Sequence, residues 1–222
     1  MVDRTPQAAR PLPGRHALSR EFIAQHQRAR IIAALAEETV EKGYRAVTVA
    51  DIVRGAGTAR NTFYENFSSK EDCFLAACDF AVNEVLGRVV DAGGKCVAWP
   101  EMIRAGLAAL LHYVASEPAL ARTCIVEVLS AGPAAVQRYE YSIQAFVPFF
   151  RHGRKLSPNG DELPETLEET IVGGIFWILY QRIIMGQVEQ IEDLLGQLVE
   201  FSLTPYLGAE AAKRAATETS TG

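Results

Sequence analysis

The side chains with the clearest chemical potential lie close together, between positions 60 and 70. Arg60, Asn61, Thr62 and Tyr64 fall within about one helical turn, and Lys70 follows shortly after. A guanidinium group can pair with guanine or with phosphate, and amide and hydroxyl side chains can reach base edges or phosphates. This set of donors is therefore suited to a polyanionic partner, and it needs a rigid support to hold it.

Residues 48–67 predict that support. The expected elements are a helix over 49–55 capped by Thr48, a tight turn at Gly57 and a second helix over 59–66. Phe63 and Phe67 share one face of the second helix, which leaves the polar side chains on the other face. Two short helices joined by a glycine turn are typical of a helix-turn-helix that reads DNA.

The segment 28–75 also resembles the N-terminal domain of the TetR (tetracycline-repressor-like) family of bacterial transcriptional regulators. The matching residues are Gly43-Tyr44, Thr48, Ile52, Ala56-Gly57, Arg60-Asn61-Thr62-Phe63-Tyr64, Phe67 and Ser69-Lys70-Glu71. The resemblance implies DNA contacts by Thr48, Arg60, Asn61, Thr62, Tyr64, Lys70 and Tyr44. Two alternatives stay open: a solvated helix face for the polar residues of the second helix, and a purely capping role for Thr48.

Three residues depart from the family pattern, namely Val53, Gly55 and Ala59. Ala59 stands where a capping serine is usual, so the cap of the second short helix is expected to move to Thr58.

The rest of the chain predicts an all-α fold. Helical spacing and breaks at glycine and proline place helices at 22–42, 69–91, 100–116, 118–130, 132–152, 164–186 and 188–206. The expected organisation is a flexible basic arm over 1–20, a three-helix DNA-binding domain over 21–68, a larger helical ligand-binding and dimerisation domain over 69–207, and a flexible tail over 208–222.

The charge distribution agrees with this division. The net charge is −5, but residues 1–70 hold eleven Lys and Arg against seven Asp and Glu, while residues 71–222 hold eleven against twenty. A basic N-terminal part on an acidic body indicates that only one end of the molecule faces a polyanion.

The larger domain is rich in aromatic residues, which favours either an ordinary core or an apolar ligand pocket. The candidate pocket residues are Tyr113, Cys124, Glu127, Phe146, Phe150 and Trp177. Glu127 interrupts an apolar run, and a carboxylate there needs a partner. It could anchor a ligand in the pocket, or it could lie at a rim or pair with Arg122 or Arg138.

No enzyme chemistry is indicated. His112 and His152 have no acid at metal-ligand spacing, and the four cysteines show no zinc pattern. We find no activated nucleophile, paired acid and base, or cofactor motif. The prediction is therefore no catalytic residues, no metal and no cofactor.

Residues 171–184 are apolar almost all round, and the helix after them is also rich in leucine. Such helices must be covered on every side, so a homodimer is expected through the helices near 164–186 and 188–206. No run has the length of a membrane span, and no export signal is evident, so we expect a cytoplasmic protein with reduced thiols.

The function predicted from the sequence is a ligand-responsive, DNA-binding transcriptional regulator. It would be a repressor that binds a palindromic double-stranded DNA operator as a dimer and is released by a largely apolar small molecule. The alternatives are an architectural DNA binder without ligand control and a helical enzyme.

Overall fold

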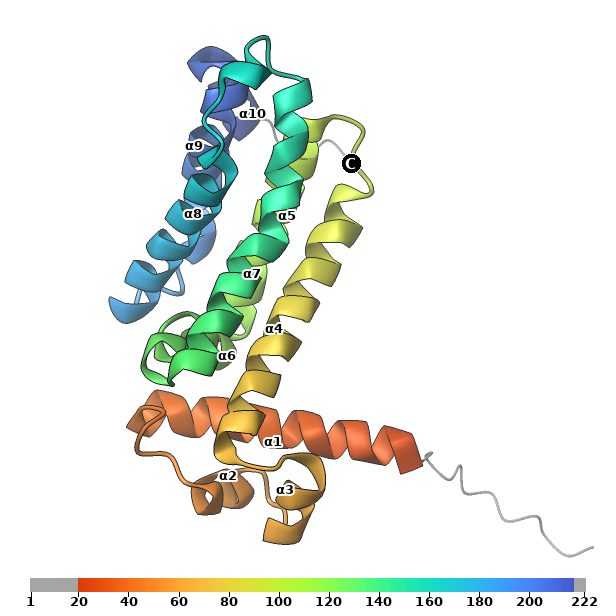
Figure 1. The fold of residues 1–222 in the computed structure, drawn as a ribbon, viewed down its shortest axis with the longest axis vertical. Helices are drawn as coiled ribbons and strands as arrows, with labels where there is room; N and C mark the ends of the chain where they lie inside the picture. Colours follow the sequence, from red (N-terminus) through yellow and green to blue (C-terminus); the bar gives the residue numbers. More distant parts are fainter. Residues whose placement is uncertain (1–19, 218–222) are drawn as a thin grey trace, which may run out of the picture.

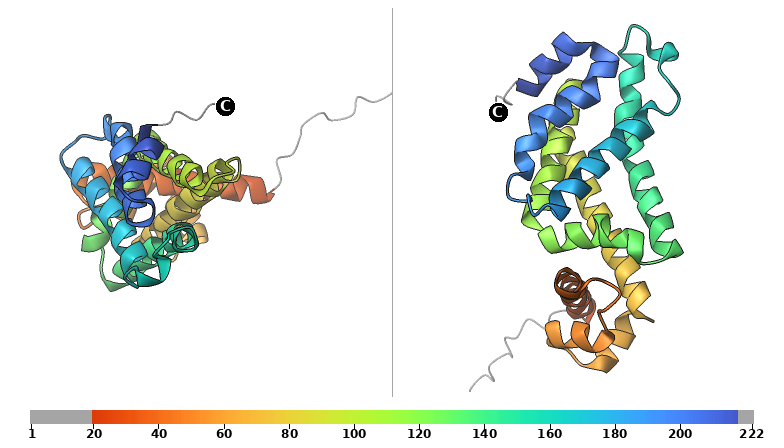
Figure 2. Two further views of the ribbon diagram at one scale, coloured as in Figure 1. Left: turned by 90° about the horizontal axis from the view of Figure 1, so that it is seen from above. Right: turned by 90° about the vertical axis from the view of Figure 1, so that its left-hand side faces the viewer.

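The computed structural model describes residues 20–217, with side chains from residue 24 onward. All regular secondary structure in that range is helical, which confirms the all-α prediction. Three helices form a foot, and α4 rises from this foot into a larger helical body (Figures 1 and 2). The basic arm predicted over 1–20 lies outside the described residues except for Arg20, where α1 begins.

The foot contains α1 (Arg20–Lys42), α2 (Val49–Gly55) and α3 (Arg60–Asn66). The body contains α4 (Lys70–Gly93), α5 (Trp99–Ser116), α6 (Pro118–Ile125), η1 (Glu127–Ser130), α7 (Pro133–Arg151), η2 (His152–Lys155), η3 (Gly160–Glu162), α8 (Leu167–Ile184), η4 (Ile191–Leu194), α9 (Leu195–Leu207) and α10 (Ala209–Thr217).

Local sequence signals explain most ends of the helices in the foot. Gly43 stops α1 with a φ of 75°, a left-handed conformation that glycine adopts without strain. The Thr48 hydroxyl accepts from the Asp51 backbone N–H, and the Asp51 carboxylate accepts from the Thr48 N–H, which closes a capping box. The start of α3 differs from the prediction, because its cap is Ala59 and no side chain satisfies the first turn.

Buried side chains form two hydrophobic clusters, one of which crosses the boundary between the two predicted helical domains. One cluster joins α1, α2 and α3 to the base of α4, and it also includes Leu120, Val128 and Ala135 from α6, η1 and α7. The other fills the body above it. The foot is therefore packed directly against the lower end of the body.

Two predicted segments differ from the structure. The helix expected over 118–130 leaves α geometry after Ile125 and continues as the tighter turn η1. Residues 209–217, expected to belong to a flexible tail, form α10, in which Ala212 is completely buried. The small alanine side chains allow α10 to lie against α9, and Arg104 donates to the Ala216 carbonyl at 2.7 Å. Residues 218–222 lie outside the described range.

A partly buried ionic cluster joins η2 to the start of α8 and the end of α9. The Glu168 carboxylate is 2% exposed and accepts from Arg154 Nε at 2.7 Å and from the Tyr206 hydroxyl at 3.0 Å. Arg154 also donates to the Leu163 and Pro164 carbonyls. Burial alone would raise the pKa of the Glu168 carboxyl, but these hydrogen bonds hold it below its usual value.

Candidate nucleic-acid interface and effector cavity

The inner face of α3 is locked into the foot. Phe63 is completely buried, Phe67 is almost so, and their ring centroids lie 5.7 Å apart. Ile52 of α2 is also fully buried in the same cluster. Because these side chains cannot turn outward without opening the core, α3 is held at a fixed orientation on α1 and α2.

The outer face of α3 carries the side chains predicted to meet DNA. Arg60, Asn61 and Tyr64 are exposed, and Thr62 is half-buried. The Arg60 guanidinium donates to the Tyr64 hydroxyl at 3.4 Å and lies 5.7 Å from the centre of its ring. This arrangement presents one cation and three neutral polar groups on a single rigid surface.

Thr48 is committed to the capping box. Its hydroxyl donates to the Asp51 carboxylate at 2.7 Å while accepting from the Asp51 backbone N–H. Lys42 and Arg54 also donate to that carboxylate, and hydrogen bonds from Lys42 and then Thr48 hold the pKa of Asp51 far below its usual value. The capping role of Thr48 is thus evident, and its phosphate contact stays a prediction.

Lys70 and Tyr44 lie deeper than the sequence suggested. The Lys70 ammonium donates to the Tyr44 and Val47 carbonyls at 2.9 and 2.8 Å, which ties the loop between α1 and α2 to the start of α4. Burial lowers the pKa of Lys70. Tyr44 is 6% exposed, with its ring 4.4 Å from that of Phe74. A DNA contact would require Lys70 to leave these carbonyls.

Arg28 belongs to the same surface but was missed in the sequence analysis. It lies on α1, donates to the Asn66 carbonyl at 3.0 Å and covers the Phe67 ring at 4.3 Å. The sequence does place Arg28 on the polar side of a long amphipathic helix, which is compatible with a contact to DNA. Only the tertiary structure shows that it lies at the end of α3.

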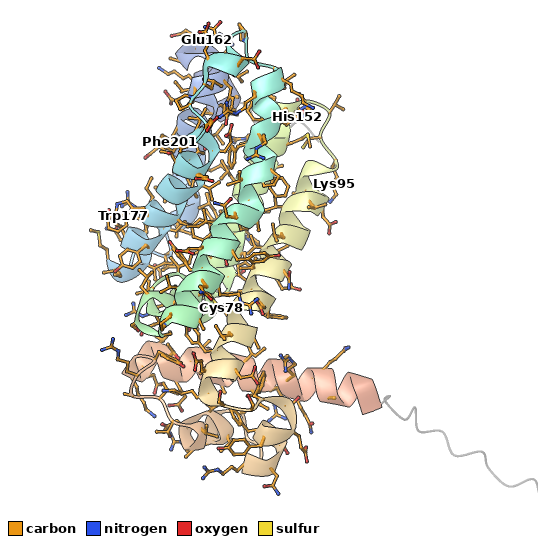
Figure 3. The ribbon with its side chains drawn as sticks, viewed as in Figure 1. Cys78, Lys95, His152, Glu162, Trp177 and Phe201 are labelled. Atoms are coloured by element: carbon orange, nitrogen blue, oxygen red, sulfur yellow. The ribbon has the colours of Figure 1, made fainter. Side chains whose placement is uncertain are left out.

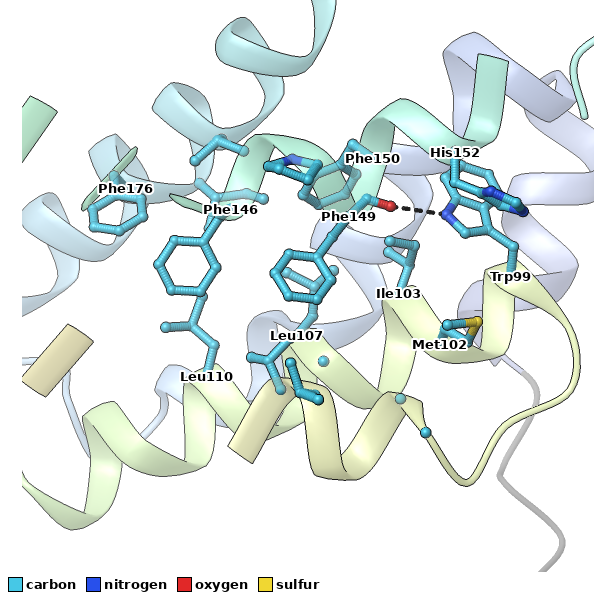
Figure 4. A pocket seen from close by; sticks show the side chains of 18 residues that line it. Trp99, Met102, Ile103, Leu107, Leu110, Phe146, Phe149, Phe150, His152 and Phe176 are labelled. Atoms are coloured by element: carbon cyan, nitrogen blue, oxygen red, sulfur yellow. Dashed lines mark hydrogen bonds between the residues drawn. The ribbon is translucent and has the colours of Figure 1, made fainter. Parts of the chain in front are cut away.

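The body encloses a main cavity of about 540 Å³ between α4, α5, α7 and α8 (Figure 4). Its lining is almost wholly apolar and includes Val89, Trp99, Met102, Ile103, Leu107, Leu110, Phe146, Phe149, Phe150 and Phe176. The Trp99 indole N–H is already satisfied by the Phe149 carbonyl at 3.0 Å. The volume lies within the range of pockets that bind small organic molecules.

A smaller chamber of about 50 Å³ adjoins the main cavity toward α6. Three residues line both spaces, namely Leu110, Phe146 and Phe176. Tyr113, Cys78, Cys124 and Ser142 line only the chamber. Burial raises the pKa of the Tyr113 phenol, and the neighbouring Cys78 thiol together with burial raises the pKa of Cys124, so these groups stay neutral.

Four of the six predicted ligand residues therefore lie at these cavities. Phe146 and Phe150 line the main cavity, and Tyr113 and Cys124 line the chamber. The lining of the main cavity from α4 and α5 was missed, because apolar residues at helical spacing look the same in a cavity wall as in a filled core.

The other two predicted ligand residues, Glu127 and Trp177, line neither cavity. The η1 turn directs the Glu127 carboxylate to the foot, where it accepts from the Tyr44 backbone N–H at 3.1 Å. Trp177 is on the outward side of α8, 57% exposed and stacked on Tyr180 at 5.4 Å. Their assignment to the pocket is corrected accordingly.

An exposed apolar surface runs along α8 and α9. Trp177 and Ile184 of α8, Met185 directly after α8 and Phe201 of α9 are each at least 46% exposed. Figure 3 shows Trp177 and Phe201 on the same outer side of the body. Large apolar side chains gathered on one side of a soluble domain usually mark an interaction surface.

Within the described residues, no cluster of His, Cys, Asp or Glu has the arrangement of a metal site. No helix in that range is long and apolar enough to cross a membrane.

The N-terminal part of the chain matches a known protein family. Residues 31–77 match the family model described as bacterial regulatory proteins, tetR family. A search of curated protein sequences returned no significant match.

Solved structures share the fold over most of the chain. FadR from Bacillus subtilis, solved in complex with stearoyl-CoA, is 17% identical with a TM-score of 0.68, covering 81% of this chain and 98% of its own. A TetR family transcription regulator from Marinobacter aquaeolei VT8 is 21% identical with a TM-score of 0.62, over 80% and 97% of the two chains. The ketosteroid regulator KstR2 of Mycobacterium tuberculosis is 18% identical with a TM-score of 0.59, over 81% and 94%. Residues 31–77 therefore match the tetR family model, and the chain as a whole shares the fold of these solved regulators.

Proposed function

We propose that this chain is a ligand-responsive repressor of the tetR family. It binds a palindromic operator as a homodimer and leaves it when a largely apolar effector enters the main cavity. The observation that carries the proposal is the combination of a rigid α3 with an exposed polar face and a cavity of about 540 Å³ in the same chain.

In this proposal α3 enters the major groove. Arg60 would pair with guanine or phosphate, and Asn61 and Thr62 would reach base edges; the exposure of Arg60 and Asn61 supports these roles. The Tyr64 hydroxyl supplies a phosphate contact that does not depend on sequence. A dimer that reads a palindrome needs its two copies of α3 about 34–36 Å apart, one helical repeat of B-form DNA.

The exposed apolar surface on α8 and α9 is the proposed dimer interface. Trp177, Ile184 and Phe201 would be covered by the same surface of a second copy, in a four-helix bundle related by two-fold symmetry. Gly173 leaves open space where a side chain would start, which permits close approach of the partner helix.

In this proposal α6 and η1 connect the ligand cavity to the DNA-binding helix α3. α6 packs on α1, and Val128 of η1 is buried in the same cluster as the α1 residues. The Glu127 carboxylate accepts from the Tyr44 N–H in the loop that precedes α2. An effector that favours a different position of α6 and η1 changes the distance between the two copies of α3 in the dimer. Its effect on operator affinity equals its preference between the two states, typically about 1–3 kcal/mol.

The chemistry of the cavity favours a long hydrocarbon or a similarly apolar effector. Its lining has almost no free polar groups, and two proteins that share the fold have names that refer to stearoyl-CoA and to ketosteroids. The effector class proposed here is therefore lipid-like.

Selection of bound duplexes from a random DNA pool tests the operator part of the proposal. We expect an enriched palindrome with half-sites one helical turn apart, which the wild-type chain binds and Arg60→Ala binds more weakly and with less base preference. Enrichment of no palindrome would contradict it and favour the architectural alternative. A reporter gene behind the selected site should be transcribed less when the chain is expressed, and increased transcription would contradict repression.

A further inference from the structure

The chamber behind the main cavity holds an unsatisfied hydrogen-bonding group. Tyr113 lines this chamber and is 3% exposed. Its hydroxyl is fully buried and has no hydrogen-bond partner among the described residues. Leaving a buried hydroxyl unpaired costs free energy, so such a group usually has a partner that binds there.

A second hydroxyl lines the same chamber. Ser142 is 5% exposed and donates its proton to the Arg138 carbonyl at 2.8 Å, so its oxygen keeps lone pairs that can accept. The chamber therefore offers the unpaired Tyr113 O–H as a donor and the Ser142 oxygen as an acceptor, and Tyr139 and the thiols of Cys78 and Cys124 also line it. No charged residue lines it. An incoming hydroxyl could use both groups, and a carbonyl could use the donor.

The shape of the two spaces sets how a ligand would lie. The main cavity opens beside Val90, Gly94, Met102 and His152, all exposed, near the upper ends of α4 and α7. The chamber lies at the other end, toward α6 and the foot. The two spaces meet at Leu110, Phe146 and Phe176, which line both, and Figure 4 shows these residues at the end of the cavity away from Trp99 and His152.

We propose that the chamber receives the oxygen-bearing far end of an elongated, otherwise apolar effector, with Tyr113 as the donor to that oxygen. This inference rests on the proposed ligand-responsive function and specifies the ligand: a hydrocarbon with a hydroxyl or keto group remote from the end that stays at the mouth. Burial keeps the Tyr113 phenol protonated, which suits a donor.

The chamber volume of about 50 Å³ limits what can enter it. A few non-hydrogen atoms fit, since a single water needs about 10–15 Å³ of such space. A carboxylate is unsuitable, because no cation lines the chamber and a buried unpaired charge is costly. The charged end of a fatty acid is thus expected at the mouth, where His152 and Lys95 are exposed (Figure 3).

Matched pairs of fatty acids test the proposal. The pairs are hexadecanoate with 16-hydroxyhexadecanoate and dodecanoate with 12-hydroxydodecanoate, titrated into the full chain by calorimetry. For the length that reaches the chamber, the wild-type chain should bind the hydroxy acid about tenfold more tightly than the plain acid, because only the hydroxy acid pairs the Tyr113 hydroxyl.

The Tyr113→Phe variant should remove this preference. The hydroxy acid should then bind about as weakly as the plain acid, while binding of the plain acid stays the same or tightens. Tyr141→Phe is the matched control, because Tyr141 is 65% exposed and lines neither cavity, so it should keep the tenfold preference. Thermal unfolding of both variants checks that they are folded.

Three results would overturn the inference: equal binding of both acids to the wild-type chain, a preference that survives Tyr113→Phe, or no binding of either acid at either length. Each is separate from the proposed repression, because operator selection is performed without effector. A chain that selects a palindrome but shows no hydroxyl preference keeps its proposed function and loses only the assignment of the chamber.

Discussion

Helix α3 takes its candidate DNA-contacting side chains from seven consecutive residues, whereas the main cavity collects its lining from α4, α5, α7 and α8. The first surface follows from the period of one helix, in which Phe63 faces inward and its polar neighbours face outward. The second depends on how four helices pack. A sequence motif is enough to predict a surface formed by one helix. A residue that lines a cavity differs from a core residue only because no other side chain fills the space beside it, and the sequence does not show this.

The largest expected effect separates the two faces of α3. Phe63→Ala should lower the free energy of unfolding by about 3–5 kcal/mol, because it leaves a cavity in the foot beside Phe67 and Ile52. Tyr64→Ala, on the exposed face, should change it by no more than about 0.5 kcal/mol. Urea denaturation of the two variants measures this contrast, and similar losses would mean that the two faces are not distinct.

The next effect concerns the body. Glu168→Gln should destabilise the chain by about 2 kcal/mol, since it breaks the ion pair with Arg154, which is itself partly exposed. Because the folded pKa of Glu168 is lowered from 4.5, its contribution is present above that pH and is lost as the pH falls through the folded pKa. Stability measured between pH 7 and pH 3 should therefore fall further in the wild-type chain than in the variant. Glu162→Gln, at an exposed site, should behave like wild type.

A third effect distinguishes base-specific from sequence-independent DNA contacts of α3. Arg60→Ala should weaken operator binding by about 2 kcal/mol and relax base preference, whereas Tyr64→Ala should weaken binding to all sequences alike. Both should leave the free energy of unfolding nearly unchanged, as expected for exposed side chains. Fluorescence anisotropy with the selected operator and a scrambled duplex checks this. Glu65→Ala, also exposed on α3, is the control, and a loss of binding there as large as in Arg60→Ala would count against specific contacts.

The smallest effect tests the link between the two regions. Glu127→Ala should leave the Tyr44 N–H without its acceptor and cost about 1 kcal/mol. Hydrogen exchange at the Tyr44 amide should become severalfold faster, while amides of α8 keep their protection. Glu140→Ala, exposed on α7, should leave this exchange unchanged. Equal protection of the Tyr44 amide from exchange in Glu127→Ala and wild type would show that the hydrogen bond between Tyr44 and Glu127 does not form in solution.

The outcome for particular residues shows what the sequence can and cannot specify. Thr48, Gly43 and Ser69 mark helix ends through contacts with neighbours a few residues away, so their roles were predictable. Glu127 has its partner 83 positions earlier in the chain, and no local pattern distinguishes that contact from a place in the pocket. Trp177 was assigned to the pocket because aromatic composition does not indicate which side of α8 faces inward.

The sequence by itself determined the all-α fold, the helix-turn-helix and the exposed polar face of α3, because these depend on spacings within one or two helical turns. Only the tertiary structure decided the cavity, the chamber at Tyr113 and the packing of α10. These depend on volumes left between helices distant in sequence, and the burial of a side chain such as Ala212 is a property of its neighbours rather than of its own residue type.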